Sequence, residues 1–190
     1  MTGNAMRWDL LFADLEGQLE AAAGDALDAD IADRTRREVA QTTLEGRLRG
    51  VSGLVVELSV AGIGPIVGEA RSVGPGWVML QVAGAMPAVV ATRHVYGARD
   101  LPVMARELAG ADESSQAGLA QVLRVLARDR TVMVIVLADG ATVTGTVDRV
   151  GTDYLDLAEH SLDEPRRATL IRGIRTIALS AVAVVRPRLE

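Results

Sequence analysis

Residues 126–157 read LARDRTVMVIVLADGATVTGTVDRVGTDYLDL, and the same pattern occurs 77 positions earlier in the chain. The matched positions share glycines, aromatic residues and aliphatic residues: Gly68 with Gly145, Val73-Gly74 with Val150-Gly151, Trp77 with Tyr154, Leu80 with Leu157, Leu58 with Ile135 and Val60 with Leu137. A repeat of this length corresponds to a small domain rather than to one unit of a solenoid. The sequence therefore predicts two copies of one small module.

Each copy is expected to form five short strands, because apolar and polar residues alternate between turn signals. Asp139-Gly140 is a strong hairpin signal. The segment 132–137 is apolar on both faces, so we expect neighbouring structure to cover both of its sides. The expected strands cover residues 54–60, 66–73, 77–82 and two short strands within 89–98, then 132–137, 142–150, 153–158, 168–177 and 182–185.

A helix followed by five short, strongly bent strands resembles the Sm-like barrel of Sm and Hfq-type proteins. The resemblance lies in Leu137-Ala-Asp-Gly140, in the segments 145–157 and 177–187, and in Leu170-Ile-Arg-Gly173. In such barrels a glycine in mid-strand, here Gly145, permits a sharp bend. The resemblance implies an α+β, mainly β fold with two tandem barrels, each preceded by a helix. Its expected parts are a helical N-terminal arm (1–43), a first barrel (44–100), a linker (101–116) and a second barrel (117–190).

The N-terminal arm is expected to be helical because its apolar residues form one stripe: Trp8, Leu11, Phe12, Leu15 and Leu19. A second helix is expected from about residue 26 to residue 49. Two roles fit Trp8 and Phe12. They dock on the barrels or on a second helix, or they belong to a helical arm through which the chain dimerises or binds a protein partner.

The closing loop of the second barrel is the candidate RNA-binding site. Residues 161–190 carry six Arg against three acidic residues, whereas the whole chain has a net charge of −5. Clustered Arg side chains contact phosphates, and exposed aromatic rings stack on bases. The alternatives are a solvated loop paired with Asp163 and Glu164, and rings of Tyr154 and Trp77 that close the barrel ends. The candidate residues are Arg166, Arg167, Arg172, Gly173, Arg175 and Tyr154.

Three other groups have a simple structural interpretation beside a functional one. Arg93-His94 forms a surface turn or binds an anion. The acidic residues Asp148, Asp153, Asp156 and Glu159 form a solvated strand edge or hold a divalent ion. His160 is expected in a loop, and with two His in the chain we expect no metal site.

No catalytic constellation is recognisable in the sequence, so we expect a non-catalytic protein without a cofactor. The chain lacks Cys, a glycine-rich phosphate loop and a nucleophile elbow. No run of eighteen apolar residues suggests a membrane span, and the acidic N-terminus does not resemble a signal peptide. We therefore expect a cytoplasmic protein with no membrane contact.

The sequence supports two functions about equally well. The first is RNA association through the Arg-rich closing loop. The second is a protein-interaction or assembly module that binds no nucleic acid, and a weaker third is a DNA-associated regulator. Because an open strand edge seeks a partner, we also expect either pairing of the barrels within the chain or a homo-oligomer.

Overall fold

The computed structural model describes residues 17–18, 24, 27, 29–102, 117–161 and 171–188. The chain divides into two compact units, Met1–Thr42 and Thr43–Glu190. The stripe predicted around Trp8 and Phe12, and the core of the linker at 110–115, lie outside the described residues.

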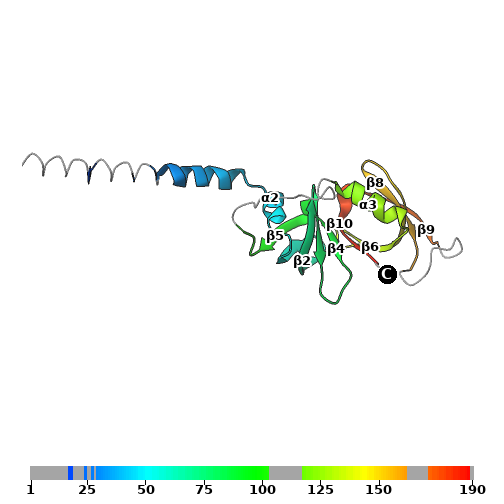
Figure 1. Ribbon diagram of the computed structural model, residues 1–190. Helices are drawn as coiled ribbons and strands as arrows, with labels where there is room; N and C mark the ends of the chain where they lie inside the picture. Colours follow the sequence, from blue (N-terminus) through cyan, green and yellow to red (C-terminus); the bar gives the residue numbers. More distant parts are fainter. Residues whose placement is uncertain are drawn as a thin grey trace, which may run out of the picture. The chain divides into compact units, whose positions relative to one another are not determined.

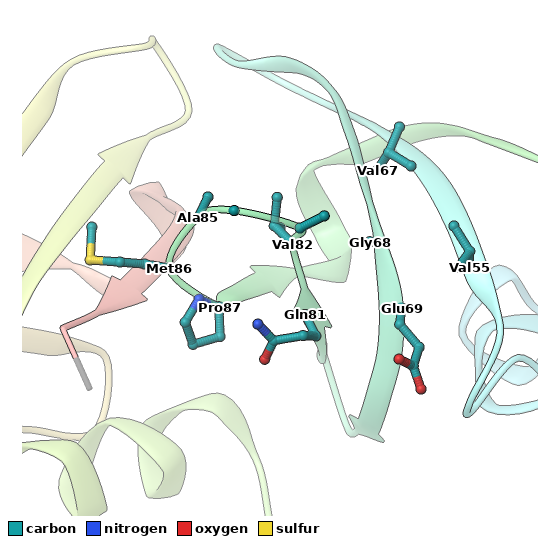
Figure 2. A pocket seen from close by; sticks show the side chains of 11 residues that line it. Val55, Val67, Gly68, Glu69, Gln81, Val82, Ala85, Met86 and Pro87 are labelled. Carbon is teal, nitrogen blue, oxygen red and sulfur yellow. The ribbon is translucent and has the colours of Figure 1, made fainter. Parts of the chain in front are cut away.

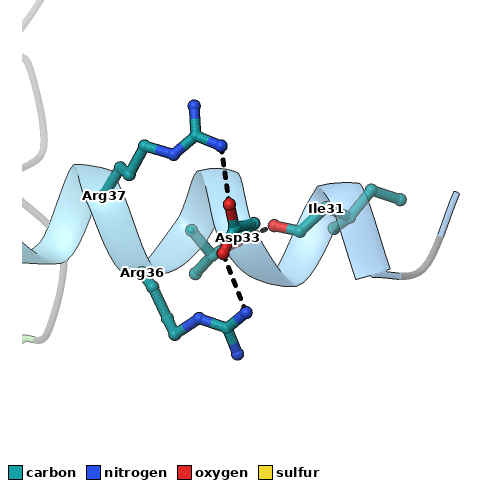
Figure 3. A network of polar contacts seen from close by, with 5 residues as sticks. Ile31, Asp33, Arg36 and Arg37 are labelled. Carbon is teal, nitrogen blue, oxygen red and sulfur yellow. Dashed lines mark hydrogen bonds and ion pairs between the residues drawn. The ribbon is translucent and has the colours of Figure 1, made fainter. Parts of the chain in front are cut away.

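Residues 29–41 of the first unit form a helix with a charged surface (Figure 3). The carboxylate of Asp33 accepts hydrogen bonds from Arg36 at 2.9 Å and from Arg37 at 2.6 Å. These two guanidinium groups, Arg37 first, hold the pKa of Asp33 below its ordinary value. Ile31 is exposed on the same helix. Pairs of this kind, at spacings of three and four residues, support a helix that has little apolar surface to bury.

The second unit consists mostly of strands (Figure 1). The two α-helices among its described residues begin differently, since the side chain of Thr43 accepts a hydrogen bond from Gly46 N and caps α2, whereas α3 has no side-chain cap. The elements are α2 (Leu44–Arg49), β1 (Val55–Val60), β2 (Gly64–Gly74), β3 (Trp77–Gln81), β4 (Ala88–Ala91), the 3-10 helix η1 (Thr92–His94), β5 (Val95–Arg99), α3 (Leu119–Arg128), β6 (Val132–Leu137), β7 (Thr142–Val150), β8 (Tyr154–Glu159), β9 (Gly173–Ala178), the 3-10 helix η3 (Leu179–Ala181) and β10 (Val182–Pro187).

The ten strands form one continuous antiparallel sheet in the order β5-β1-β2-β3-β4-β10-β6-β7-β8-β9. The expectation of two tandem closed five-stranded barrels is therefore wrong. The physical reason lies in the middle of the sheet, where β4 pairs with β10, placing Val90 opposite Val184 and Val89 opposite Val185. Since β4 bonds β3 and β10, and β5 bonds β1, the first five strands do not close on themselves. The sheet is open and ends at β5 and β9.

The central strands are covered on both faces, each face by a different hydrophobic core. On β6, Val136 lies in one core, while Met133 and Ile135 lie in the other. β4 alternates in the same way, with Val90 in the first core and Val89 in the second. The prediction that segment 132–137 is covered on both sides is confirmed. The helices cap these cores, α2 through Leu48 in the first and α3 through Leu119 and Leu123 in the second.

The first five and the last five strands of the sheet contain the same irregularities at a spacing of 77 residues. The β2–β3 register shifts between Ala70 and Ser72, and the β7–β8 register shifts between Val147 and Arg149. A side chain at Gly68 would meet the carbonyl oxygen of Gln81, and one at Gly145 would collide with that of Ala158. These glycines are needed because the neighbouring strand approaches closely.

Candidate functional site

The predicted RNA-binding residues lie along β8, β9 and the turn before β9, as far as the structure describes them. Arg166 and Arg167 lie outside the described residues. Arg172 is exposed and donates to Ser161 Oγ at 3.2 Å, and Gly173 begins β9. Arg175 is ion-paired with Glu159 on the neighbouring strand. Arg175 is thus neutralised by an acidic neighbour, which weakens its attraction for phosphate.

The two aromatic residues at equivalent positions cover the preceding turns. The ring of Trp77 lies against Gly74 and the ring of Tyr154 against Gly151, so that a side chain at either glycine would strike the ring. Trp77 is buried, and its indole Nε1 donates to the carbonyl oxygen of Ala117 at 2.6 Å. Trp77 therefore has a structural role, while Tyr154 is half-buried.

The predicted surface turn at Arg93 and His94 is confirmed, since both lie in η1 between β4 and β5, where Arg93 is exposed and His94 is half-buried. The Arg93 guanidinium donates to the carbonyl oxygen of Leu179, and His94 Nε2 lies 2.8 Å from the carbonyl oxygen of Ser180. These contacts join η1 to η3, beside the β4–β10 pairing. We call this set of contacts the η1–η3 clamp. Local sequence patterns contain no signal for it, because its acceptors are main-chain groups 86 residues away.

His160 is buried, with 2% of its surface exposed. Its Nε2 lies 2.8 Å from Thr146 Oγ1, and its Nδ1 lies 2.9 Å from the carbonyl oxygen of Ser161. Both ring nitrogens are thus satisfied inside the fold. Within the described residues, no group of three or more His, Cys, Asp and Glu is arranged to hold a metal ion.

The acidic side chains of β8 face basic or hydroxyl partners on the neighbouring strands. Asp156 accepts a hydrogen bond from Thr176 at 2.7 Å and lies 4.0 Å from Arg149. Glu159 pairs with Arg175. These contacts are cross-strand pairs of the kind that stabilise a sheet.

A shallow groove of about 900 Å³ lies over the outer face of β1, β2 and β3 (Figure 2). Figure 2 shows Val55 and Val67 on the strands, with the loop that carries Met86 on the other side. Glu69 is the one charged side chain among the described residues that line the groove, and it is paired with Arg71. The groove is mostly apolar and contains no set of groups for acid–base or nucleophilic chemistry.

Each edge strand of the sheet carries a large apolar side chain that is exposed. Tyr96 on β5 is 72% exposed, and Ile174 on β9 is 66% exposed. Among the strands that the structure describes, each edge strand has a partner on one side alone, β1 for β5 and β8 for β9. Unpaired N–H and C=O groups along an edge can accept a further strand.

No helix in the described part of the chain has the length and apolar character needed to traverse a lipid bilayer. The sequence matches no model of a known protein family, and comparison with curated proteins also gives no match. The resemblance to Sm-like barrels therefore rests on the residues quoted for it.

Proposed function

We propose that this chain is a non-catalytic protein-assembly module that binds partners by adding strands to the two edges of its sheet. The observation that carries this proposal is the pairing of β4 with β10, in which a strand of one half lies along a strand of the other. The free edge strand β5 has the place in the first half that β10 has in the second half. The free edge strand β9 has the place in the second half that β4 has in the first half.

The two halves of the sheet are two copies of one unit under this proposal. The first half has the order β5-β1-β2-β3-β4, and the second has the order β10-β6-β7-β8-β9. The matched register shifts and glycine contacts support the same correspondence. β9 is then the counterpart of β4, and β5 is the counterpart of β10. β4 and β10 pair with each other inside the chain, whereas their counterparts β9 and β5 form the two edges of the sheet.

RNA association is the second candidate, and the described residues support it less. The cation of Arg175 is paired with Glu159, and that of Arg149 lies 4.0 Å from the carboxylate of Asp156. A nucleic-acid surface needs unpaired positive charge, because release of counterions from phosphates supplies much of its affinity. Arg172 remains exposed, so contact with RNA is an outcome that the experiment must detect.

Photo-crosslinking in the cell that makes the protein tests the proposal. A photoreactive phenylalanine analogue replaces Tyr96 or Ile174, and a control carries it at Val125 on α3, which is 49% exposed and away from both edges. We expect protein adducts from positions 96 and 174 well above those from position 125. Adducts that nuclease removes, or yields equal to the control, would overturn the proposal.

A further inference from the structure

The two halves of the sheet are joined by one junction, the pairing of β4 with β10. The edge strands β9 and β5 correspond to these two strands. In this internal junction, β4 and η1 of the first half meet η3 and β10 of the second half. The segment β9-η3-β10 repeats the layout of β4-η1-β5 at a spacing of 87 residues, since η1 begins at Thr92 and η3 begins at Leu179. β9 therefore corresponds to β4, and β5 corresponds to β10.

Building on the function proposed above, we infer that the partner of β9 is strand β5 of a second copy of this chain. The spacing of 87 residues also fixes the register. Val90 opposite Val184 becomes Ile177 opposite Gly97, and Val89 opposite Val185 becomes Thr176 opposite Ala98. The added pair is antiparallel, as are the pairs within the sheet.

The bulge on β5 does not prevent this pairing. β5 shifts register against β1 at Tyr96, between Val95 and Gly97. β10 shifts register against β6 at the corresponding residue, Ala183, and still pairs with β4. A bulge at this position is thus compatible with a strand on the other side.

The exposed side chain of Tyr96 at the β5 edge corresponds to a residue that the internal junction covers, and the counterpart of Ile174 at the β9 edge is less exposed than Ile174 itself. Tyr96 is 72% exposed, and its counterpart Ala183 is fully buried in the first core. Ile174 is 66% exposed, and its counterpart Pro87 is half-buried. Pairing of β9 with β5 of a second copy would cover the side chain of Tyr96, as the internal junction covers Ala183, and burial of its apolar ring favours association.

The junction between copies is weaker than the junction within the chain. Arg93 and His94 correspond to Ser180 and Ala181, whose side chains are too short to reproduce the η1–η3 clamp. Thr176 also takes the place of the buried Val89, and its hydroxyl is bonded to Asp156. We therefore expect a reversible association that depends on protein concentration.

The geometry of the contact is head-to-tail, because the two edges differ. Such a contact leaves one free β9 and one free β5 on every pair of copies. Further copies then add until the assembly closes into a ring or continues as an open chain.

Disulfide trapping tests the register, since the natural chain has no Cys. We mix the purified full-length variants Thr176→Cys and Ala98→Cys under mild oxidation. The matched control replaces Thr176→Cys with Arg175→Cys, one residue along β9, where the side chain points to the opposite face. A disulfide between positions 98 and 176, at least about tenfold more abundant than one between positions 98 and 175, supports the register, because disulfide formation requires close Cβ atoms. Equal yields overturn it.

A variant designed to strengthen association tests the assembly, because loss of folding would not produce the expected increase in affinity. Ser180→Arg with Ala181→His transfers the two clamp side chains to the junction between copies, where they face the main chain at Thr92 and Arg93 of the second copy. We expect the midpoint concentration of association, measured by sedimentation, to fall by about tenfold. If the natural chain and this variant both remain monomeric at every concentration, the inference is overturned. Protein adducts in the cell from positions 96 and 174 would then still support strand addition by a different partner.

Discussion

Strands β4 and β9 occupy corresponding places in the two halves of the sheet and have opposite surroundings. The residues of β4 are all buried, between β3 and β10. Those of β9 are exposed except for Ile177. The sequences agree with this difference, since β4 reads Ala-Val-Val-Ala and the corresponding part of β9 reads Arg-Thr-Ile-Ala. The comparison teaches that a strand covered on both faces becomes apolar throughout, whereas an edge strand retains polar residues.

The largest expected difference comes from the same substitution at the two corresponding alanines. Ala91→Asn places an amide in the second core, and we expect the free energy of unfolding to fall by about 4 kcal/mol. Ala178→Asn lies on the exposed face of β9, and we expect a change within about 0.5 kcal/mol. Urea unfolding followed by circular dichroism measures both. Similar losses for the two variants would show that β4 and β9 have the same surroundings after all.

The glycines of the two halves give the next largest effect. At Gly145 a side chain would collide with the carbonyl oxygen of Ala158, so we expect Gly145→Ala to reduce stability by about 3 kcal/mol. At Gly68 the nearest atom, the carbonyl oxygen of Gln81, would lie 2.9 Å away, and we expect a loss of about 1 kcal/mol for Gly68→Ala.

Gly173→Ala is the control for these variants, because nothing lies within 4 Å of the added atom. Thermal unfolding gives the ranking. A Gly68 variant less stable than the Gly145 variant would contradict the relative closeness of β2–β3 and β7–β8.

The two arginines beside the junction and beside the free edge should differ by a smaller amount. Arg93→Ala removes a donor from the η1–η3 clamp, and we expect a loss of about 1 kcal/mol in unfolding free energy. Arg175→Ala removes an ion pair whose side chains remain partly exposed, and we expect a loss within about 0.5 kcal/mol. Chemical denaturation of both variants at low protein concentration measures this difference. A larger loss for Arg175→Ala would locate the stronger contact at the edge.

The smallest effect concerns the helix of the first unit, which has no counterpart in the sheet. The pKa of Asp33 is lowered by Arg37 and Arg36, so the charged carboxylate is favoured in the helix. Because the folded pKa lies below the unfolded one, this contribution is present at neutral pH and is lost as the pH falls through the folded pKa.

Titration of the Asp33 carboxyl carbon by NMR measures this shift directly. In the double variant Arg36→Gln, Arg37→Gln, we expect the pKa to rise toward its ordinary value. An unchanged titration would show that the two ion pairs are not populated in solution.

Local patterns in the sequence predicted the strands well and their assembly poorly. The segment 132–137 coincides with β6, and 142–150 coincides with β7, because alternation and Asp139-Gly140 are local signals. The turn between β4 and β5 was also expected at Thr92-Arg93-His94. Pairing between the two halves within the chain is one of the two outcomes expected from the sequence, and β4 does pair with β10. Which strands pair could not be predicted, since main-chain bonds between distant strands leave no local trace in the sequence.

For the candidate site, too, the sequence predicts local features but not the contacts between distant strands. The Arg-rich segment is evident from composition, but the neutralisation of Arg175 depends on Glu159, which approaches it through cross-strand pairing. The apolar runs at Val89-Val90 and Val184-Val185 could have indicated strands covered on both faces. Applied to these short segments, the reasoning used for β6 would have placed them at the centre of the sheet.

Strands β4, β10 and β6 contribute residues to both hydrophobic cores, and this arrangement also bears on how the polypeptide could be divided. If the gene were split within the segment that joins Pro102 to Ala117, the first fragment would carry β1 to β5 and the second β6 to β10. The first would then expose β4 along its full length, and the second would expose β10. Each half alone would then be prone to aggregate, whereas co-expression would restore the missing neighbour. The molecule thus offers a natural pair for fragment complementation, in which recovery of the fold reports that two tethered proteins have met.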